Sequence, residues 1–240
     1  VYSVLEIDKF KGSKYMQSYT EDTFKEIVKK ADGKKYAIFG TPCHIYPMNK
    51  WAVSKGKRDQ FIFIDIFCHG CPSMYLWKKY LDDVKEKAKV TKFEKIEFRS
   101  KEYGWHEYCN TFHKGSKRFI SGKAINDPFF TLFFDNQLLC KACYDCKLRS
   151  TLEYTDIRLG DYWGDKFDLD IKGVSAVVAC TTKGKKVFGV IKDKMIIKST
   201  NLDDIIKAQS YGKSYNCSTN ARHSALDLLK SGKSMNEIFK

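Results

Sequence analysis

The sequence predicts a mixed α/β (α+β) fold that has parallel strand–loop–helix units, an antiparallel extension and a cysteine-rich loop. Between residues 34 and 88, two short apolar strands are each followed by a short loop and a helical pattern. This order is typical of sheets with parallel strands. Over residues 93–122, apolar and polar residues alternate in short runs, which indicates antiparallel strands. The third observation is a loop at 140–146 that carries three cysteines.

The first elements form one strand between two helices. A helix is predicted over 21–31, with Thr20 as its N-cap and Gly33 just beyond its end. A strand over 34–40 follows, and a second helix is expected to start just after Pro42. The face of the first helix that we expect to be buried consists of Phe24, Ile27, Val28 and Ala31.

The same order is then repeated. "FIFIDIF" (61–67) has the length and composition of a buried strand, "CHGCPS" is a turn, and 74–88 is helical. Functional loops in such sheets lie at the carboxyl ends of the strands. Cys43 and Cys68 both follow a strand, so we expect them at the same sheet edge. The inward face of the helix consists of Trp77, Tyr80, Leu81 and Val84.

The second half of the chain alternates short strands and helices. "DPFFTLFFDN" (127–136) is too aromatic to be solvated and predicts a buried helix with Pro128 in its first turn. We treat residues 1–240 as one domain. The remaining predicted elements are antiparallel strands at 93–99, 108–114 and 117–122, buried strands at 155–161 and 172–182, and peripheral helices at 184–193, 202–209 and 223–232.

Composition places the chain among cytoplasmic globular proteins. No run of about 18 apolar residues is present, so no membrane span is predicted. The first residues, "VYSVLEIDKF", lack the basic and apolar regions of a signal peptide. Nine cysteines without a secretion signal are more typical of metal or redox chemistry in a reducing compartment than of disulfides.

The formal charge of +14 raises the possibility of nucleic-acid binding. However, only six of the 43 basic residues are arginines, and the lysines are spread along the chain beside acidic residues. This pattern favours a solvated surface over a nucleic-acid face. A basic rim would still attract an acidic electron-carrier protein or a phosphate-bearing cofactor.

The spacing C-x2-C-x2-C at Cys140, Cys143 and Cys146 indicates metal coordination. It matches the first three ligands of a bacterial [4Fe–4S] run, although no fourth Cys-Pro follows. Structural zinc held by four thiolates is the alternative, and plain buried thiols are the third. The spacing favours an iron–sulfur cluster over zinc. Structural zinc and plain buried thiols stay open as alternatives.

Other motifs are weaker. Gly160-Asp161 followed by Trp163 is a tight turn with an aromatic side chain, which suits a ligand that approaches the backbone closely. "GSKY" at 12–15 is a Gly-Ser turn with one lysine that fits a phosphate. No G-x-G-x-x-G or P-loop pattern is present, so classical dinucleotide and P-loop sites are disfavoured. No catalytic side chain is assigned.

Taken together, these pieces resemble the beta-subunit family of coenzyme F420-reducing hydrogenases and dehydrogenases. The matching segments occur in order over nearly the whole chain. They are "KGSKYMQS", "GTPCHI", "DIFCHGCPSMYLWKKYL", "CYDCKL", "TDIRLGDYWG" and "GVSAVVACT". Family members usually carry more sequence before "GSKY", so the chain is expected to be a fragment. His44 stands where the family often has Gln, a change that could tune the cluster.

The resemblance implies an iron–sulfur flavoprotein with one [4Fe–4S] cluster beside an FAD. Its acceptor would be coenzyme F420 or another small two-electron acceptor, and its partners an electron-carrier protein or other hydrogenase and dehydrogenase subunits. The implied cluster ligands are Cys43, Cys68, Cys143 and Cys146. The family usually lacks cysteine at the positions of Cys71 and Cys140.

The resemblance also implies which residues bind the cofactor. They are Gly12, Ser13, Lys14, Thr41, Pro42, Gly160, Asp161, Trp163, Gly173 and Ser175. Among these, Lys14, Asp161 and Ser175 are the expected polar contacts to flavin or acceptor. Two other hypotheses remain: a zinc-stapled binding module that contacts nucleic acid or a partner, and a degenerate member that assists in assembly.

Overall fold

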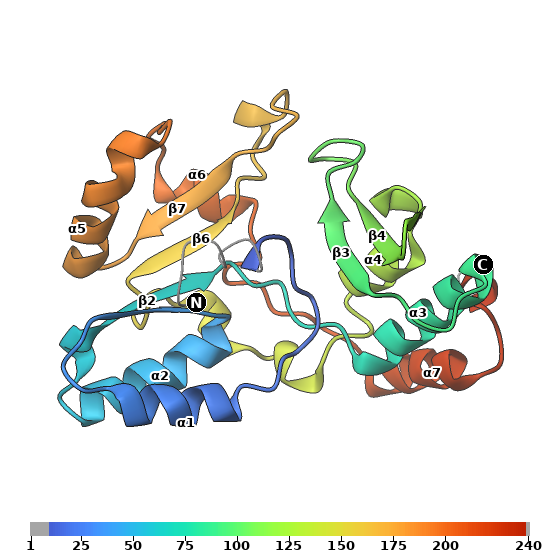
Figure 1. Cartoon of the computed structure of the whole chain (residues 1–240), viewed down its shortest axis with the longest axis horizontal. Helices are drawn as coiled ribbons and strands as arrows, with labels where there is room; N and C mark the ends of the chain where they lie inside the picture. Colours follow the sequence, from blue (N-terminus) through green and yellow to red (C-terminus); the bar gives the residue numbers. More distant parts are fainter. Residues whose placement is uncertain (1–9, 239–240) are drawn as a thin grey trace. The chain divides into compact units, whose positions relative to one another are not determined.

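The computed structural model describes residues 10–238, so part of the N-terminal stretch that lacks a signal-peptide pattern lies outside the described residues. The described chain divides into two compact units (Figure 1). Unit 1 comprises 10–17, Gly70–Tyr144 and 215–238, and unit 2 comprises Ser18–His69 and Asp145–Ser214. The prediction of a single domain for the whole chain stays a prediction.

Unit 2 is built around a four-stranded mixed sheet with the order β1-β2-β6-β7. Its strands are β1 (Tyr36–Phe39), β2 (Phe61–Ile66), β6 (Ile157–Asp161) and β7 (Ser175–Ala179). The first three strands run parallel, and β7 pairs antiparallel with β6. Its helices are α1 (Glu21–Lys30), α2 (Pro42–Ser54), α5 (Thr182–Ile191) and α6 (Leu202–Lys207), with short 3-10 turns η2 (Arg58–Gln60), η5 (Lys147–Ser150), η6 (Asp165–Phe167) and η7 (Lys192–Lys194).

Two apolar clusters hold unit 2 together. One joins α1 and α2 to the sheet through buried Ile45, Met48, Phe61 and Phe63. Phe24 and Ile27 of α1 pack against it, whereas Val28 is exposed, so the predicted inward face of that helix is narrower than expected. The second cluster consists of Tyr162, Ala176 and Ile205, with partly buried neighbours.

Unit 1 contains a separate antiparallel sheet with the order β3-β4-β5. Its aromatic core includes Trp77, Tyr80, Phe112 and Phe129. The strands are β3 (Lys95–Ser100), β4 (Cys109–Lys114) and β5 (Lys117–Ile120). The helices are α3 (Met74–Ala88), α4 (Pro128–Phe134), α7 (Thr219–Lys230) and α8 (Met235–Ile238), with 3-10 turns η3 (Ala124–Asn126) and η4 (Lys141–Cys143).

The predicted α/β fold class is confirmed, and the main elements lie where the sequence predicts them. The helix over 74–88 has the expected bounds, and α2 starts at Pro42. Two differences concern long-range placement. Helix α3 follows β2 along the chain but belongs to unit 1, and the antiparallel strands form their own sheet instead of extending the parallel one.

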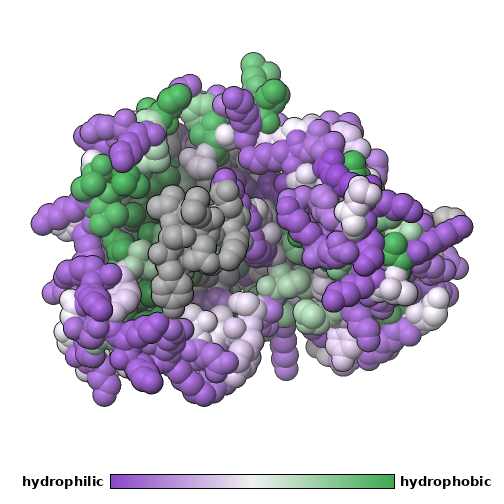
Figure 2. All heavy atoms as spheres, viewed as in Figure 1, coloured by the Kyte–Doolittle hydropathy of each residue, from purple (hydrophilic) through white to green (hydrophobic). Residues whose placement is uncertain are grey.

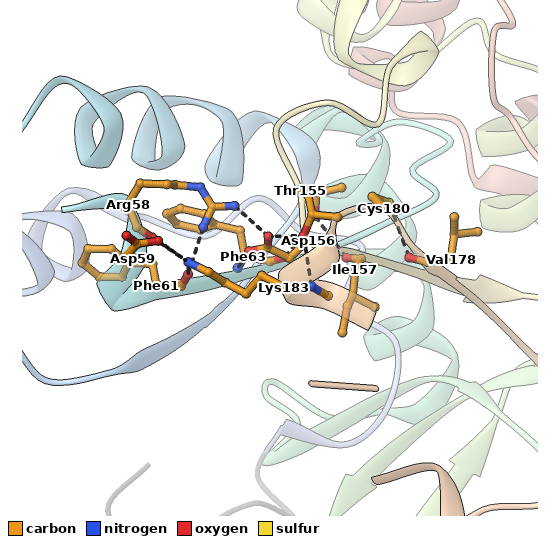
Figure 3. Close-up of polar contacts among 12 residues, drawn as sticks. Arg58, Asp59, Phe61, Phe63, Thr155, Asp156, Ile157, Val178, Cys180 and Lys183 are labelled. Atoms are coloured by element: carbon orange, nitrogen blue, oxygen red, sulfur yellow. Dashed lines mark hydrogen bonds and ion pairs between the residues drawn. The ribbon is translucent and has the colours of Figure 1, made fainter. Parts of the chain in front are cut away.

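A buried carboxylate ties α5 to the sheet of unit 2 (Figure 3). Asp156 is almost fully buried. It accepts hydrogen bonds from the Arg58 guanidinium at 2.8 Å, the Phe63 backbone N–H at 2.8 Å and the Thr181 hydroxyl at 2.6 Å. Because a buried charge is costly unless it is paired and hydrogen-bonded, this network explains how Asp156 is accommodated.

The face shown in Figure 2 is mostly hydrophilic, with hydrophobic side chains exposed around α5. The exposed apolar residues of this region include Val190, Ile191, Met195 and Ile196. No helix within residues 10–238 is long and apolar enough to cross a membrane.

Candidate cofactor site at a sheet edge

Three loops meet at one edge of the unit 2 sheet: those after β1 and β2, and the connection from β6 to β7. Since β1, β2 and β6 are parallel and adjacent, their carboxyl ends lie at the same edge. Strand β7 is antiparallel to β6, so it begins at that edge. This is the edge at which open α/β sheets bind their ligands.

Nine residues singled out from the sequence lie at or beside this edge. They are Thr41, Pro42, Cys43, Cys68, Gly160, Asp161, Trp163, Gly173 and Ser175. Asp161 and Ser175 are direct cross-strand partners, and Gly160 is opposite Ala176. The expectation that Cys43 and Cys68 share one sheet edge is therefore met by the strand order, because each follows one of two adjacent parallel strands.

The loop after β1 places Cys43 in the first turn of α2. Thr41 is the N-cap residue with extended backbone, and Pro42 takes the first helical position. The Thr41 hydroxyl lies 3.1 Å from the Cys43 sulfur and 3.1 Å from His44 Nδ1. Cys43 is exposed. Metal ions bind the thiolate form of a cysteine. Burial lowers the pKa of His44, which favours its neutral form.

A buried arginine connects the Cys68 and Cys146 segments of unit 2. The Arg149 guanidinium donates to the His69 carbonyl at 3.0 Å and to the Lys213 carbonyl at 2.7 Å. The Arg149 backbone N–H donates to the Cys146 carbonyl at 3.2 Å. The η5 turn, which follows Cys146, also packs against α2. The segments that carry three of the implied ligands are thus linked within one unit.

Gly160 and Asp161, predicted to form a tight turn, are instead the last two residues of β6, because they pair with Ala176 and Ser175 of β7. A Cβ atom at Gly160 would lie 2.9 Å from the Phe67 ring, so this position needs a residue without a side chain. The Tyr162 backbone N–H donates to the Val174 carbonyl at 2.8 Å, which closes the turn onto the start of β7. Gly173 has a φ of 76°, a conformation that favours glycine. Trp163 is exposed beside this turn.

A buried ion pair supports the edge from inside the sheet. Asp65 on β2 and Arg158 on β6 are register partners. The guanidinium donates to both carboxylate oxygens, at 2.9 and 2.6 Å, and also to the Tyr154 hydroxyl at 2.7 Å. Both side chains are almost fully buried. This bidentate pair cross-links the two strands at whose ends Cys68 and Gly160 lie.

The remaining implied residues belong to unit 1. Gly12, Ser13 and Lys14 precede Tyr15, whose ring packs among the phenylalanines of the unit 1 core. Ser13 forms an isolated bridge with Phe98. The Lys14 ammonium donates to the carbonyls of Lys11 and Gly12, at 2.7 and 3.0 Å, so it would have to leave these partners to bind a phosphate.

The three-cysteine loop is divided between the units. Cys140 and Cys143 belong to unit 1, together with Cys71, and Cys146 belongs to unit 2. A hydrogen bond from the Cys71 thiol lowers the pKa of Cys140 to about 7, and the positive charge of Arg222 contributes in the same direction. Cys180 follows β7 at the opposite edge of the sheet, and burial raises its pKa to about 11.

The donor set fits an iron–sulfur cluster in its chemistry. Thiolates are the usual ligands of such clusters, and unit 2 contributes Cys43, Cys68 and Cys146 from linked segments. Within residues 10–238, no group of three or more Cys, His, Asp or Glu side chains is already arranged to hold a metal ion.

Sequence reasoning missed the residues that support this edge. Arg149, Asp65 and Arg158 were not singled out, although all three are buried and charged. The available signal was that arginine is scarce in this lysine-rich chain. Buried ion pairs and multiple carbonyl contacts favour arginine over lysine, so the few arginines were candidates for such buried roles. Phe67 could not have been found, since its role depends on contact with a residue 93 positions away.

Comparison with known proteins identifies the family. The family model for the C terminus of the coenzyme F420 hydrogenase/dehydrogenase beta subunit matches residues 33–205, which is more than half of the chain. The match includes β1, β2, β6 and β7 and every loop of the sheet edge described above. A search of curated proteins finds no matching relative. On the strength of the family match, this chain belongs to the coenzyme F420 hydrogenase/dehydrogenase beta-subunit family.

Proposed function

We propose that this protein is an iron–sulfur flavoprotein oxidoreductase. It would pass electrons between a [4Fe–4S] cluster and FAD to a deazaflavin, coenzyme F420, or another two-electron acceptor. The observation that carries the proposal is the sheet edge of unit 2, where Cys43 and Cys68 follow the adjacent strands β1 and β2, and Gly160 lies at the end of the next strand, β6. Family membership supports the oxidoreductase class.

The proposed cluster ligands are Cys43, Cys68, Cys143 and Cys146. Three of them belong to unit 2, and Cys143 lies three residues before Cys146 along the chain. Cys43 would bind from the first turn of α2, and Arg149 would hold the Cys68 and Cys146 segments together through its carbonyl contacts. Cys140 is outside this ligand set.

The turn after β6 and the start of β7 are proposed to contact the flavin. Asp161 and Ser175 offer polar groups on adjacent strands, Trp163 offers an exposed ring, and Gly160 and Gly173 are the proposed backbone contacts. A bound flavin would exchange one electron at a time with the cluster and two with the acceptor. The chain's own residues would bind and orient these groups, and none needs to act as a covalent catalyst.

The proposed partners are an electron-carrier protein or other hydrogenase and dehydrogenase subunits, because the family is a beta-subunit family. A net charge of +14 would favour association with an acidic carrier. Nucleic acid is not proposed as a partner, and the proposed compartment is the cytoplasm.

The direct test is the composition of protein purified without oxygen. We expect about four irons and about four acid-labile sulfides per chain, which is the stoichiometry of a [4Fe–4S] cluster. We also expect bound FAD rather than nicotinamide, since the classical dinucleotide motif is absent. Stoichiometric zinc without sulfide would instead support the zinc-stapled binding module. Tight binding of NAD by flavin-free protein would contradict the flavin assignment.

A further inference from the structure

Two thiols that the proposed cluster does not use face each other in unit 1. Pro72 and Leu139 form an antiparallel bridge, so Cys71 and Cys140 are directly opposite residues on the two paired segments. The Cys140 backbone N–H donates to the Cys71 carbonyl at 2.8 Å. One step further along, the Ser73 N–H donates to the Leu138 carbonyl at 2.7 Å, which continues the same pairing.

The side chains of this pair also meet. Both sulfurs lie near the same acceptor, the Pro72 carbonyl oxygen, at 3.5 Å for Cys71 and 3.6 Å for Cys140. Neither thiol is in a disulfide, and both side chains are half-buried, which leaves part of each accessible to a small reagent.

This backbone arrangement is compatible with a disulfide. Directly opposite residues in antiparallel pairs have Cα atoms about 4.5–5.5 Å apart, and this pair makes one of the two possible backbone hydrogen bonds. Disulfides span Cα separations of roughly 4.4–6.8 Å, so the bridge would need little movement of the main chain. We infer that Cys71 and Cys140 form a reversible dithiol–disulfide couple that exchanges with low-molecular-weight disulfides.

The exchange is balanced in two steps. One protein thiolate attacks a sulfur of the small disulfide, which forms a mixed disulfide and releases one small thiol. The other protein thiol then attacks the protein sulfur of the mixed disulfide and releases the second small thiol. The protein loses two electrons and two protons, and the reagent gains them as two thiols.

Cys143 is the main competitor for either partner. Its sulfur accepts from the Cys71 backbone N–H at 3.3 Å, and its own N–H donates to the Cys140 carbonyl at 2.9 Å. These contacts involve the backbone of the pair, whereas the thiols of Cys71 and Cys140 lie against the same Pro72 carbonyl. The couple therefore uses Cys140 with Cys71 and leaves Cys143 for the proposed cluster.

Peptide mapping distinguishes these possibilities. The full chain would be reduced, incubated with glutathione disulfide, alkylated and digested with trypsin. Lys141 separates Cys140 from Cys143, so Cys140 is the only cysteine of peptide 124–141. We expect a dithiothreitol-sensitive link between 124–141 and 59–78, and fragmentation should assign it to Cys71 rather than Cys68. The link should be absent in Cys71→Ser and retained in Cys217→Ser, a half-buried thiol elsewhere in unit 1.

Two outcomes would overturn the inference. One is a link from 124–141 to 142–147, the peptide that holds Cys143 and Cys146. The other is a stable glutathione adduct on Cys140 without any protein disulfide. Both outcomes would be detected in the wild-type chain. They therefore depend neither on whether a variant folds nor on the iron content of a variant.

Discussion

At the scale of single residues, the most consequential interaction is the ion pair between Asp65 and Arg158. Each side chain is almost fully buried, and their bidentate contact joins β2 to β6. A buried pair adds little net stability over a hydrophobic replacement, because desolvation offsets much of the attraction. Removal of one partner is different, since it leaves the other charge buried without compensation.

We predict that Arg158→Met lowers the free energy of unfolding by roughly 3–5 kcal/mol, the usual cost of breaking a buried ion pair. Chemical denaturation at neutral pH measures this change. A second substitution, Asp65→Leu, should recover much of the loss because it removes the stranded carboxylate.

The matched control is Arg118→Met in unit 1. Arg118 also contacts a carboxylate, Glu102, at 2.6 Å, but both side chains are 37% exposed. Exposed ion pairs contribute little to stability. Equal destabilisation by the two Arg→Met substitutions would show that burial does not determine the effect.

At the scale of elements, α5 packs unusually closely on the segment that leads into β6. A Cβ atom at Gly184 would lie 2.0 Å from the Asp156 carbonyl oxygen, which is backbone and cannot rotate away. The Thr181 hydroxyl accepts from the Gly184 N–H at 3.0 Å and donates to Asp156, so the start of the helix is fixed to the same residue. Glycine is therefore required where the helix touches the sheet.

We predict that Gly184→Ala destabilises the protein by about 1–3 kcal/mol or more, the range for overpacked sites. Gly189 is the control within the same helix, because a Cβ atom there meets no atom within 4 Å. Gly189→Ala should stabilise the protein by roughly 0.5–1 kcal/mol through the helix preference of alanine. Thermal unfolding of the two variants should therefore shift in opposite directions, and shifts of the same sign would contradict this packing.

At the scale of the whole molecule, the proposed ligands come from three segments, which carry Cys43, Cys68, and Cys143 with Cys146. Two ligand assignments compete. Local spacing would group Cys140 with Cys143 and Cys146. The family pattern instead requires Cys43 and Cys68. The sheet topology favours the second, because it brings the Cys43 and Cys68 loops to one edge, whereas Cys140 pairs with Cys71 in unit 1.

We predict that Cys140→Ser keeps the cluster, whereas Cys43→Ser and Cys68→Ser each lose it or reduce it to a smaller iron species. Iron content and low-temperature electron paramagnetic resonance of anaerobic preparations measure the difference. Cluster loss in Cys140→Ser with retention in Cys43→Ser would show that local spacing determines the ligands.

Much of this organisation could be predicted from the sequence because it depends on local patterns. The apolar face of 74–88 predicted α3, and the aromatic run with Pro128 in its first turn predicted α4, each close to its observed bounds; apolar runs identified β2 and β7. The position of Cys43 and Cys68 at one edge followed from the strand–loop–helix order, because parallel strands place their carboxyl ends together. The cofactor assignments came from family resemblance, and they stay predictions until iron, sulfide and flavin are measured.

Long-range pairing was decided only by the tertiary structure. An amphipathic helix can pack on any matching apolar surface, so its pattern could not assign α3 to the aromatic core of unit 1 instead of the parallel sheet. The facing of Cys71 and Cys140 depends on a bridge between segments almost 70 residues apart. Similarly, Arg149 links Cys146 to the Cys68 loop through carbonyl groups. Every residue has a carbonyl group, so a sequence pattern cannot show which carbonyls an arginine will contact. Only the completed fold decides which carbonyls lie near Arg149.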